Sequence, residues 1–163
     1  MKAVDYLNHK MMKEEDLLRW VERWKFAGKK IVFTNGVFDL LHAGHIHSLK
    51  QAAVFGDILI VGVNSDSSVK RLKGESRPVQ CVEDRIEILS SLEMVDAVVL
   101  FEDDTPLPLI QKIKPNILVK GGDYSIDTIV GAKEVLALGG SVQIIPLIPG
   151  KSSTGLINKL NDL

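Results

Sequence analysis

The sequence has a single cysteine, Cys81, among 163 residues, so it can form no disulfide within the chain and has no Cys cluster of metal-binding spacing. It has no excess of basic charge either, because 20 Lys and Arg face 21 Asp and Glu. A global basic field that would attract nucleic acid is therefore excluded. No apolar run reaches the length of a membrane span, and charged N-terminal residues exclude a signal-peptide core. We expect a cytoplasmic protein without nucleic-acid or membrane partners.

Two common nucleotide-binding motifs are also missing. No Gly-x-Gly-x-x-Gly follows the first predicted strand, which argues against a dinucleotide cofactor. Gly150-Lys151-Ser152 resembles the end of a Walker A loop, but that motif needs a glycine at position 145, where this chain has Ile145. The sequence therefore argues against a P-loop, and any phosphate site must be local and of another kind.

The hydrophobic pattern predicts one domain over residues 1–163, with a packing helix within residues 1–29 and a core at 30–163. Short apolar runs predict strands at 31–33, 58–63, 95–101, 116–119 and 142–145, and stretches of helical spacing separate them. This alternation predicts an α/β fold, a Rossmann-like doubly wound parallel sheet of five strands with right-handed crossovers.

Residues 30–47 pass from an apolar run through a polar loop into a helical pattern, which is typical of a strand, a ligand-facing loop and a helix start. Gly36 and Gly44 let the backbone approach a ligand, and the first N–H groups of a helix favour anions. His42 and His45 lie three residues apart, so both side chains can converge on one group of oxygens. Positioned donors of this kind stabilise the charge that develops in phosphoryl or nucleotidyl transfer.

Two other interpretations of these histidines exist. They could be ordinary polar residues at a helix cap, although the strand context, the glycines and the pairing favour a site. They could also join His47 in a zinc site. That is less favoured, because no cysteine accompanies them and His47 lies two residues beyond His45, so it points elsewhere on a helix.

The segment from Gly36 to His45, Gly-Val-Phe-Asp-Leu-Leu-His-Ala-Gly-His, resembles the HxGH signature of the cytidylyltransferase-like nucleotidyltransferases. The resemblance is specific, because the glycine, both histidines and the preceding Phe38-Asp39 occur together after a predicted strand. It implies a nucleotidyltransferase of HxGH type, with a catalytic core at 30–163.

Further polar segments follow the later strands. Asn64-Ser65-Asp66 more often caps a helix than binds a ligand. Residues 70–78 predict a basic loop, which alone would be a solvated surface but after a phosphate site is a candidate clamp. Residues 120–124 form a second glycine-containing loop, and the hydroxyls of residues 152–154 can cap a helix or donate to a phosphate.

From about residue 30 onward the chain also resembles the adenylyltransferase domain of the ADP-heptose pathway. Val-Asn-Ser-Asp, Lys-Arg-Leu-Lys-Gly-Glu-Ser-Arg-Pro-Val, Val-Lys-Gly-Gly-Asp-Tyr and Lys-Ser-Ser-Thr carry that resemblance. It implies transfer of AMP from ATP, with Mg²⁺, to D-glycero-D-manno-heptose 1-phosphate by direct attack. In bifunctional members a sugar kinase precedes this domain, and 163 residues leave no room for one, so we expect a separate kinase. We also expect a homo-oligomer, a dimer.

The resemblance also assigns roles to residues. His42, His45 and Lys73 are the expected catalytic residues. Nucleotide contacts are expected from Thr34, Asn35, Gly36, Val37, Phe38, Gly44, Lys120, Gly121, Asp123, Ser152, Ser153 and Thr154, and sugar-phosphate contacts from Asp39, Asn64, Lys70 and Arg77.

Two alternatives remain open. One is a cytidylyltransferase for a small alcohol phosphate such as glycerol 3-phosphate, whose closing motif carries Arg-Thr where this chain has Leu147-Ile148. The other is a nucleotide-binding module without catalysis, against which the retained His42, His45 and Lys73 argue. The roles of Lys151 and His47 stay undetermined at this point.

Overall fold

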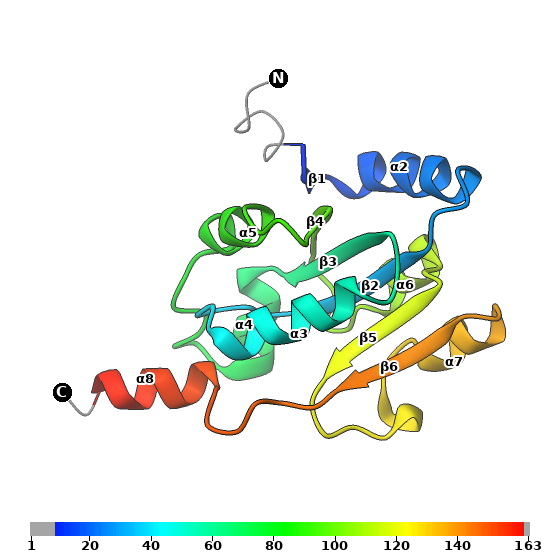
Figure 1. The fold of residues 1–163 in the computed structure, drawn as a ribbon. Helices are drawn as coiled ribbons and strands as arrows, with labels where there is room; N and C mark the ends of the chain where they lie inside the picture. Colours follow the sequence, from blue (N-terminus) through cyan, green and yellow to red (C-terminus); the bar gives the residue numbers. More distant parts are fainter. Residues whose placement is uncertain (1–8, 162–163) are drawn as a thin grey trace.

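The computed structural model describes residues 9–161, which form a parallel sheet of six strands in the order β1-β4-β3-β2-β5-β6 (Figure 1). Residues 1–8 and 162–163 of the predicted domain lie outside the described residues. The strands are β1 (Met11–Met12), β2 (Ile31–Gly36), β3 (Ile58–Asn64), β4 (Ala97–Phe101), β5 (Ile117–Gly121) and β6 (Ser141–Ile145). The helices are α2 (Glu14–Phe26), α3 (Ala43–Ala53), α4 (Asp66–Lys73), α5 (Val82–Ser90), α6 (Leu107–Ile113), the 3-10 turn η1 (Ile126–Thr128), α7 (Ala132–Ala137) and α8 (Ser153–Asn161).

Helices cover both faces of the sheet, as a doubly wound fold requires. On one face, Ile31 and Phe33 of β2 belong to a core shared with α2, α6 and α7. On the other face, Val32 belongs to a core that includes Leu49 of α3 and Leu89 of α5. Successive strand residues point to opposite faces, so the apolar run Ile31 to Phe33 of β2 is buried on both sides. This confirms the α/β fold predicted from the alternating pattern.

The chain reverses its direction of winding at β2, which pairs with β3 on one side and β5 on the other. The connections that leave the carboxyl ends of β2 and β5 therefore run over different faces of the sheet. Open α/β sheets bind ligands in the crevice that opens at such a point. The HxGH segment follows β2 directly, so the topology places it beside this crevice.

The prediction of five strands was short by one. Strand β1 has only two residues, and it pairs in parallel with β4 at the edge of the sheet, with Met11 opposite Val98. Two residues carry no usable hydrophobic period, and the strand exists because β4 offers it hydrogen-bonding partners, such as Val98 N, which donates to Lys10 O at 2.7 Å.

The predicted basic loop at 70–78 was wrong in its first half, because Lys70 to Lys73 form the last turn of α4. Ser65 caps that helix, its side chain accepting from Ser68 N at 3.1 Å, as the sequence favoured. Basic side chains in a last turn face the negative end of the helix dipole, which stabilises them there. Lys73 therefore sits at a helix end and not on a loop.

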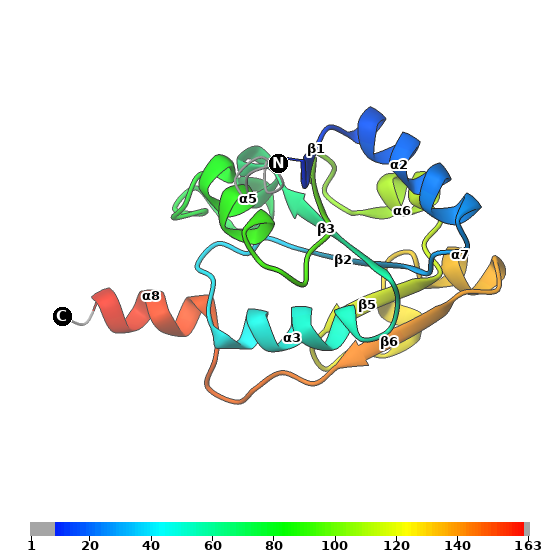
Figure 2. The same ribbon diagram turned by 45° about the horizontal axis from the view of Figure 1, so that its top comes forward.

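Helix α8 extends away from the sheet next to the N-terminal end of α3 (Figures 1 and 2). Ser153 Oγ donates to Leu40 O at 3.2 Å, while Leu156 and Leu160 are exposed. None of the helices within residues 9–161 is long and apolar enough to cross a membrane.

Candidate active site

A cavity of about 320 Å³ opens at the carboxyl ends of β2 and β5. It brings together four segments that lie far apart in the sequence: the β2–α3 connection, the end of α4, the end of β5 and residues 151–154. The predicted site residues that line it are Thr34, Asn35, Gly36, Val37, Phe38, Asp39, His42, Gly44, His45, Lys73, Lys120, Gly121, Ser152, Ser153 and Thr154.

The two histidines of the HxGH segment lie face to face at the start of α3. Their ring centroids are 3.9 Å apart, and His42 is the N-cap residue, its Nδ1 accepting from Gly44 N at 3.1 Å. His42 therefore caps α3 and also lines the cavity. Because Nδ1 accepts, the neutral ring carries its proton on Nε2, which is left as a donor.

Both histidines are poor bases in this site. Burial, and then the charges of His42 and Lys73, lower the pKa of His45 from 6.5 to about 4. Burial, and then the charge of Lys151, lower the pKa of His42. At neutral pH both rings are therefore uncharged, and a neutral imidazole keeps one N–H that can act as a donor.

Lysines from three elements surround these rings. Lys73 comes from α4, Lys120 from β5 and Lys151 from the segment before α8. Burial lowers the pKa of Lys120, whose Nζ lies 3.5 Å from Asn35 Oδ1. Burial, and then the charge of Arg77, lower the pKa of Lys73. Such a cluster of cations costs free energy unless an anion joins it, so the cavity is built for a phosphate-bearing ligand.

Backbone geometry explains the glycine between the histidines. A Cβ on Gly44 would lie 2.8 Å from the Cε1 atom of the His42 ring, so a side chain there would displace that ring. Phe38 has a φ of 50°, and its ring centroid lies 5.3 Å from that of His45. A bulky residue in the left-handed region is held there by its surroundings, and such positions gather at functional sites.

Residues 33–156, which contain the whole cavity, match the cytidylyltransferase-like family. The chain belongs to this family of nucleotidyltransferases. The HxGH segment and its histidine pair are the part of the sequence that had predicted this family.

Relatives named bifunctional protein HldE are similar over most of the chain. That of Koribacter versatilis is 48% identical over 97% of this chain and 32% of its own length, and that of Acidiphilium cryptum is 55% identical over 85% and 29%. The chain therefore spans about a third of the length of these relatives.

Two solved structures have a similar fold. The lipopolysaccharide core biosynthesis protein from Thermoplasma volcanium is 32% identical, with a TM-score of 0.59 over 74% of this chain and 98% of its own. Pantoate-beta-alanine ligase from Francisella tularensis is 19% identical, with a TM-score of 0.62 over 94% of this chain and 78% of its own. The second likeness concerns the fold alone.

Within this family site, Asp39 is an anchor of the loop and not a free ligand. Its Oδ2 accepts from Arg77 Nε at 2.5 Å, and its Oδ1 accepts from Val79 N and Gln80 N at 2.7 and 2.9 Å. Burial alone would raise the pKa of this carboxyl, but these hydrogen bonds outweigh burial and lower it. Asp39 lines the cavity and Arg77 does not, and the sugar-phosphate contacts expected of both residues stay predictions.

Three further predicted residues do not line the cavity. Asn64 is buried and its Nδ2 donates to Ser68 Oγ at 3.0 Å, so its side chain serves the start of α4. The Nζ atom of Lys70 lies 3.9 Å from the carboxylate of Glu75, and Asp123 is exposed. The ligand contacts expected of these three residues therefore stay predictions.

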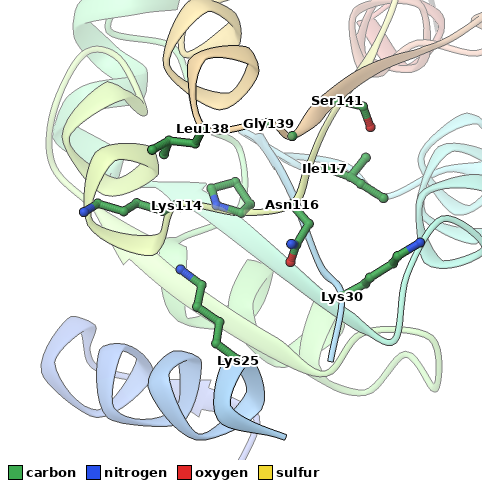
Figure 3. Close-up of a pocket in the computed structure, with 10 residues that line it drawn as sticks. Lys25, Lys30, Lys114, Asn116, Ile117, Leu138, Gly139 and Ser141 are labelled. Carbon is green, nitrogen blue, oxygen red and sulfur yellow. The ribbon is translucent and has the colours of Figure 1, made fainter. Parts of the chain in front are cut away.

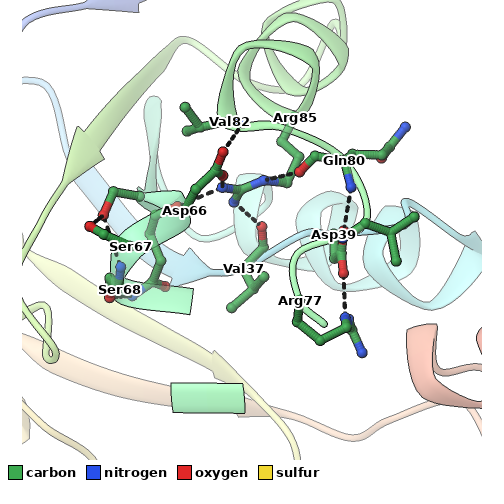
Figure 4. Close-up of polar contacts among 12 residues, drawn as sticks. Val37, Asp39, Asp66, Ser67, Ser68, Arg77, Gln80, Val82 and Arg85 are labelled. Carbon is green, nitrogen blue, oxygen red and sulfur yellow. Dashed lines mark hydrogen bonds and ion pairs between the residues drawn. The ribbon is translucent and has the colours of Figure 1, made fainter. Parts of the chain in front are cut away.

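Sequence reasoning also missed residues of this region. Ser48, Leu49, Val119, Tyr124, Leu147 and Lys151 line the cavity, and Lys151 had been left without a role. Arg85 on α5 is fully buried and donates to Val37 O, Asn64 O, Gln80 O and the carboxylate of Asp66 (Figure 4). The sequence could have indicated that Arg85 is buried, because it lies on the same helical face as Val82 and Leu89, where an apolar residue is expected.

A second cavity, of about 450 Å³, lies near the start of β5 and β6 (Figure 3). It is lined by Lys25, Lys30 and Lys114, but Lys25 Nζ donates to Ile113 O at 2.6 Å. Figure 3 shows the ammonium groups of Lys30 and Lys114 extending to opposite sides. Its cations do not converge on one point, so the HxGH cavity is the better candidate site.

The zinc interpretation of the histidines gains no support. In the part of the chain that the structure describes, no group of three or more His, Cys, Asp or Glu side chains could hold a metal ion. His47 does not line the cavity.

Proposed function

We propose that this chain transfers AMP from ATP to D-glycero-D-manno-heptose 1-phosphate. An oxygen of the sugar phosphate attacks the α-phosphorus of ATP in line with the bond to the β-phosphate. The new P–O bond gives ADP-heptose, and the broken bond releases pyrophosphate. Catalysis of this kind depends on positioning and on stabilising charge at the α-phosphorus.

The observation that carries the proposal is the stacked, uncharged pair His42 and His45 surrounded by lysines. Each neutral ring would donate its N–H to phosphate oxygens that gain charge in the transition state. Lys73 would neutralise the sugar phosphate and the leaving pyrophosphate. The N-terminus of α3 at Gly44 adds backbone donors and the positive end of a helix dipole.

Direct attack needs no base from the protein. A phosphate monoester is largely ionised at neutral pH, so the attacking oxygen carries its own charge. A histidine with a pKa near 4 is neutral at that pH and is better placed as a donor than as a proton acceptor. Lys120 and the hydroxyls of Ser152 to Thr154 would hold the nucleotide.

Mg²⁺ would enter with ATP as part of the substrate, where it neutralises phosphate charge. Among the described residues that line the cavity, Asp39 is the one carboxylate, and its oxygens already accept from Arg77, Val79 and Gln80. The ion would therefore be held by phosphates and water.

Two observations support the choice of substrates. The similarity to HldE relatives and to a lipopolysaccharide core biosynthesis protein supports an ADP-sugar for cell-surface carbohydrate. Leu147 lines the cavity, where it offers no hydrogen bond to a cytosine. A separate kinase reaction would supply the sugar 1-phosphate.

Pyrophosphate release tests the proposal, with ATP or CTP as donor and heptose 1-phosphates, hexose 1-phosphates or glycerol 3-phosphate as acceptor. We expect turnover with ATP and a heptose 1-phosphate. Faster turnover with CTP and glycerol 3-phosphate would support the cytidylyltransferase alternative. Nucleotide binding without any pyrophosphate release would support a non-catalytic module.

The mechanism has a separate test, which uses ATP that is chiral at the α-phosphorus. Direct attack predicts inversion at phosphorus and no AMP bound covalently to the protein. Net retention, or labelled AMP recovered on His42 or His45, would replace direct attack with a covalent route.

A further inference from the structure

The buried guanidinium of Arg85 joins four segments of the chain (Figure 4). Its Nη1 donates to Val37 O at 2.6 Å, and its Nη2 donates to Asn64 O at 2.9 Å and to Asp66 Oδ1 at 2.6 Å. Its Nε donates to Gln80 O at 3.1 Å, and none of the side chain is exposed. Since Arg85 does not line the cavity, it has no direct access to a bound substrate.

Two of these acceptors lead directly to the expected catalytic groups. Val37 precedes Phe38, the residue with positive φ whose ring lies beside that of His45. Asp66 is the first residue of α4, and Lys73 is the last. One guanidinium therefore holds both the loop behind His45 and the helix that carries Lys73.

We propose that Arg85 is a positioning residue that fixes the placement of Lys73 relative to His45 for nucleotidyl transfer, which rests on the proposed function. A planar guanidinium can serve acceptors from several directions at once, whereas a lysine ammonium is a point charge on a flexible stem. The guanidinium of Arg85 therefore fixes the position of α4 relative to the HxGH loop, because its N–H groups bind acceptors in both segments. A misplacement of about 1 Å in such a site costs about 10²-fold in rate.

The first test is Arg85→Lys, which keeps the positive charge and removes the planar guanidinium with its several N–H donors. We expect kcat to fall by about 10-fold to 10²-fold while KM for ATP changes by less than about threefold, because the displaced groups act in the transition state. The matched control is Arg71→Lys. Arg71 lies on the same helix but its guanidinium donates to Asp104 and to Glu102 O at the surface, so its kcat stays unchanged.

A double-mutant cycle separates positioning from plain core support. If Arg85 acts through Lys73, then Arg85→Lys lowers kcat by less than about threefold once Lys73 is already alanine. A full, multiplicative loss in the Lys73→Ala background would overturn the proposal. Should Arg85→Lys fail to fold, Asp66→Ala removes one of the four acceptors of Arg85, and the same comparison is made with it.

A second readout needs no substrate, so it separates this proposal from the proposed function. In the NMR titration of His45 we expect the pKa to rise from about 4 in the unmodified protein toward 6.5 in Arg85→Lys, because the loop opens to water. Arg71→Lys should leave it unchanged. An unchanged His45 titration in folded Arg85→Lys would overturn the positioning role, whereas absent turnover by the unmodified protein would overturn only the proposed function.

Discussion

The cavity has two walls that are built differently. The histidine wall, residues 34–45 together with Lys73, stands on β2 and is held by the buried groups Asp39 and Arg85. The C-terminal wall, residues 147–154, leads into α8, whose Leu156 and Leu160 are exposed. Regions with few buried contacts open at low cost in free energy. We therefore expect the C-terminal wall to open more readily than the histidine wall.

The most severe loss should follow removal of a donor from the histidine wall. We expect His45→Ala to lower kcat by about 10²-fold to 10³-fold and to change KM for ATP little, because its N–H matters most when charge builds on the α-phosphate. Steady-state kinetics measures both constants. His47→Ala is the control, since His47 lies outside the cavity, and comparable damage from it would return a metal cluster to consideration.

Lys73 gives the next largest effect. Lys73→Ala should lower kcat by about 10²-fold, whereas Arg71→Ala keeps most activity because Arg71 pairs with Asp104, with its Nε 2.7 Å from Oδ1. Kinetics on both variants tests whether the end of α4 belongs to the histidine wall. Mild losses of similar size would make the basic segment an ordinary solvated surface.

The histidine wall should also make stability depend on pH. The pKa of His45 is about 4 in the folded protein and 6.5 as the ordinary value, so the unfolded chain takes up this proton first as pH falls. The stability that the uncharged His45 ring contributes is therefore fully present above about pH 6.5 and is lost as the pH falls toward 4. The ring is only partly buried, so we expect a loss of about 2 kcal/mol, less than the full difference.

Urea unfolding at pH 7 and near pH 4 measures that loss, and His45→Gln is the reference because carboxyl groups titrate in both proteins. The free energy of unfolding should fall by about 2 kcal/mol more in the unmodified protein than in His45→Gln. Equal losses would show that His45 is not held uncharged by the fold.

The smallest effect is expected in α8, to which the C-terminal wall leads. Leu160→Ala should change the free energy of unfolding by less than about 0.5 kcal/mol, since Leu160 is 64% exposed. Leu49→Ala is the matched comparison from α3, where the buried leucine should cost about 2–5 kcal/mol. Chemical denaturation of both variants tests the contrast, and a large loss at Leu160 would mean that α8 has a partner surface.

The extent of sequence prediction differed along the chain for physical reasons. The strand before His42 and the spacing of the HxGH segment were predictable, because apolar runs and short-range geometry are local properties. The sequence did not predict that β2 extends to Gly36, because pairing with β3 determines where the strand ends. The ion pair between Asp39 and Arg77 was not predictable either, because it joins positions far apart in the sequence.

The sequence by itself determined the alternation of strands and helices, the histidine pair at the start of α3 and the lysines that could meet a phosphate. Only the tertiary structure decided which basic groups face the cavity, since Lys73 points inward while Arg71 pairs with Asp104. It also decided that Arg85 is buried among carbonyl groups. A charged side chain is buried only when distant segments supply its partners, and those partners are set by the packing of helices on the sheet, which no local pattern records.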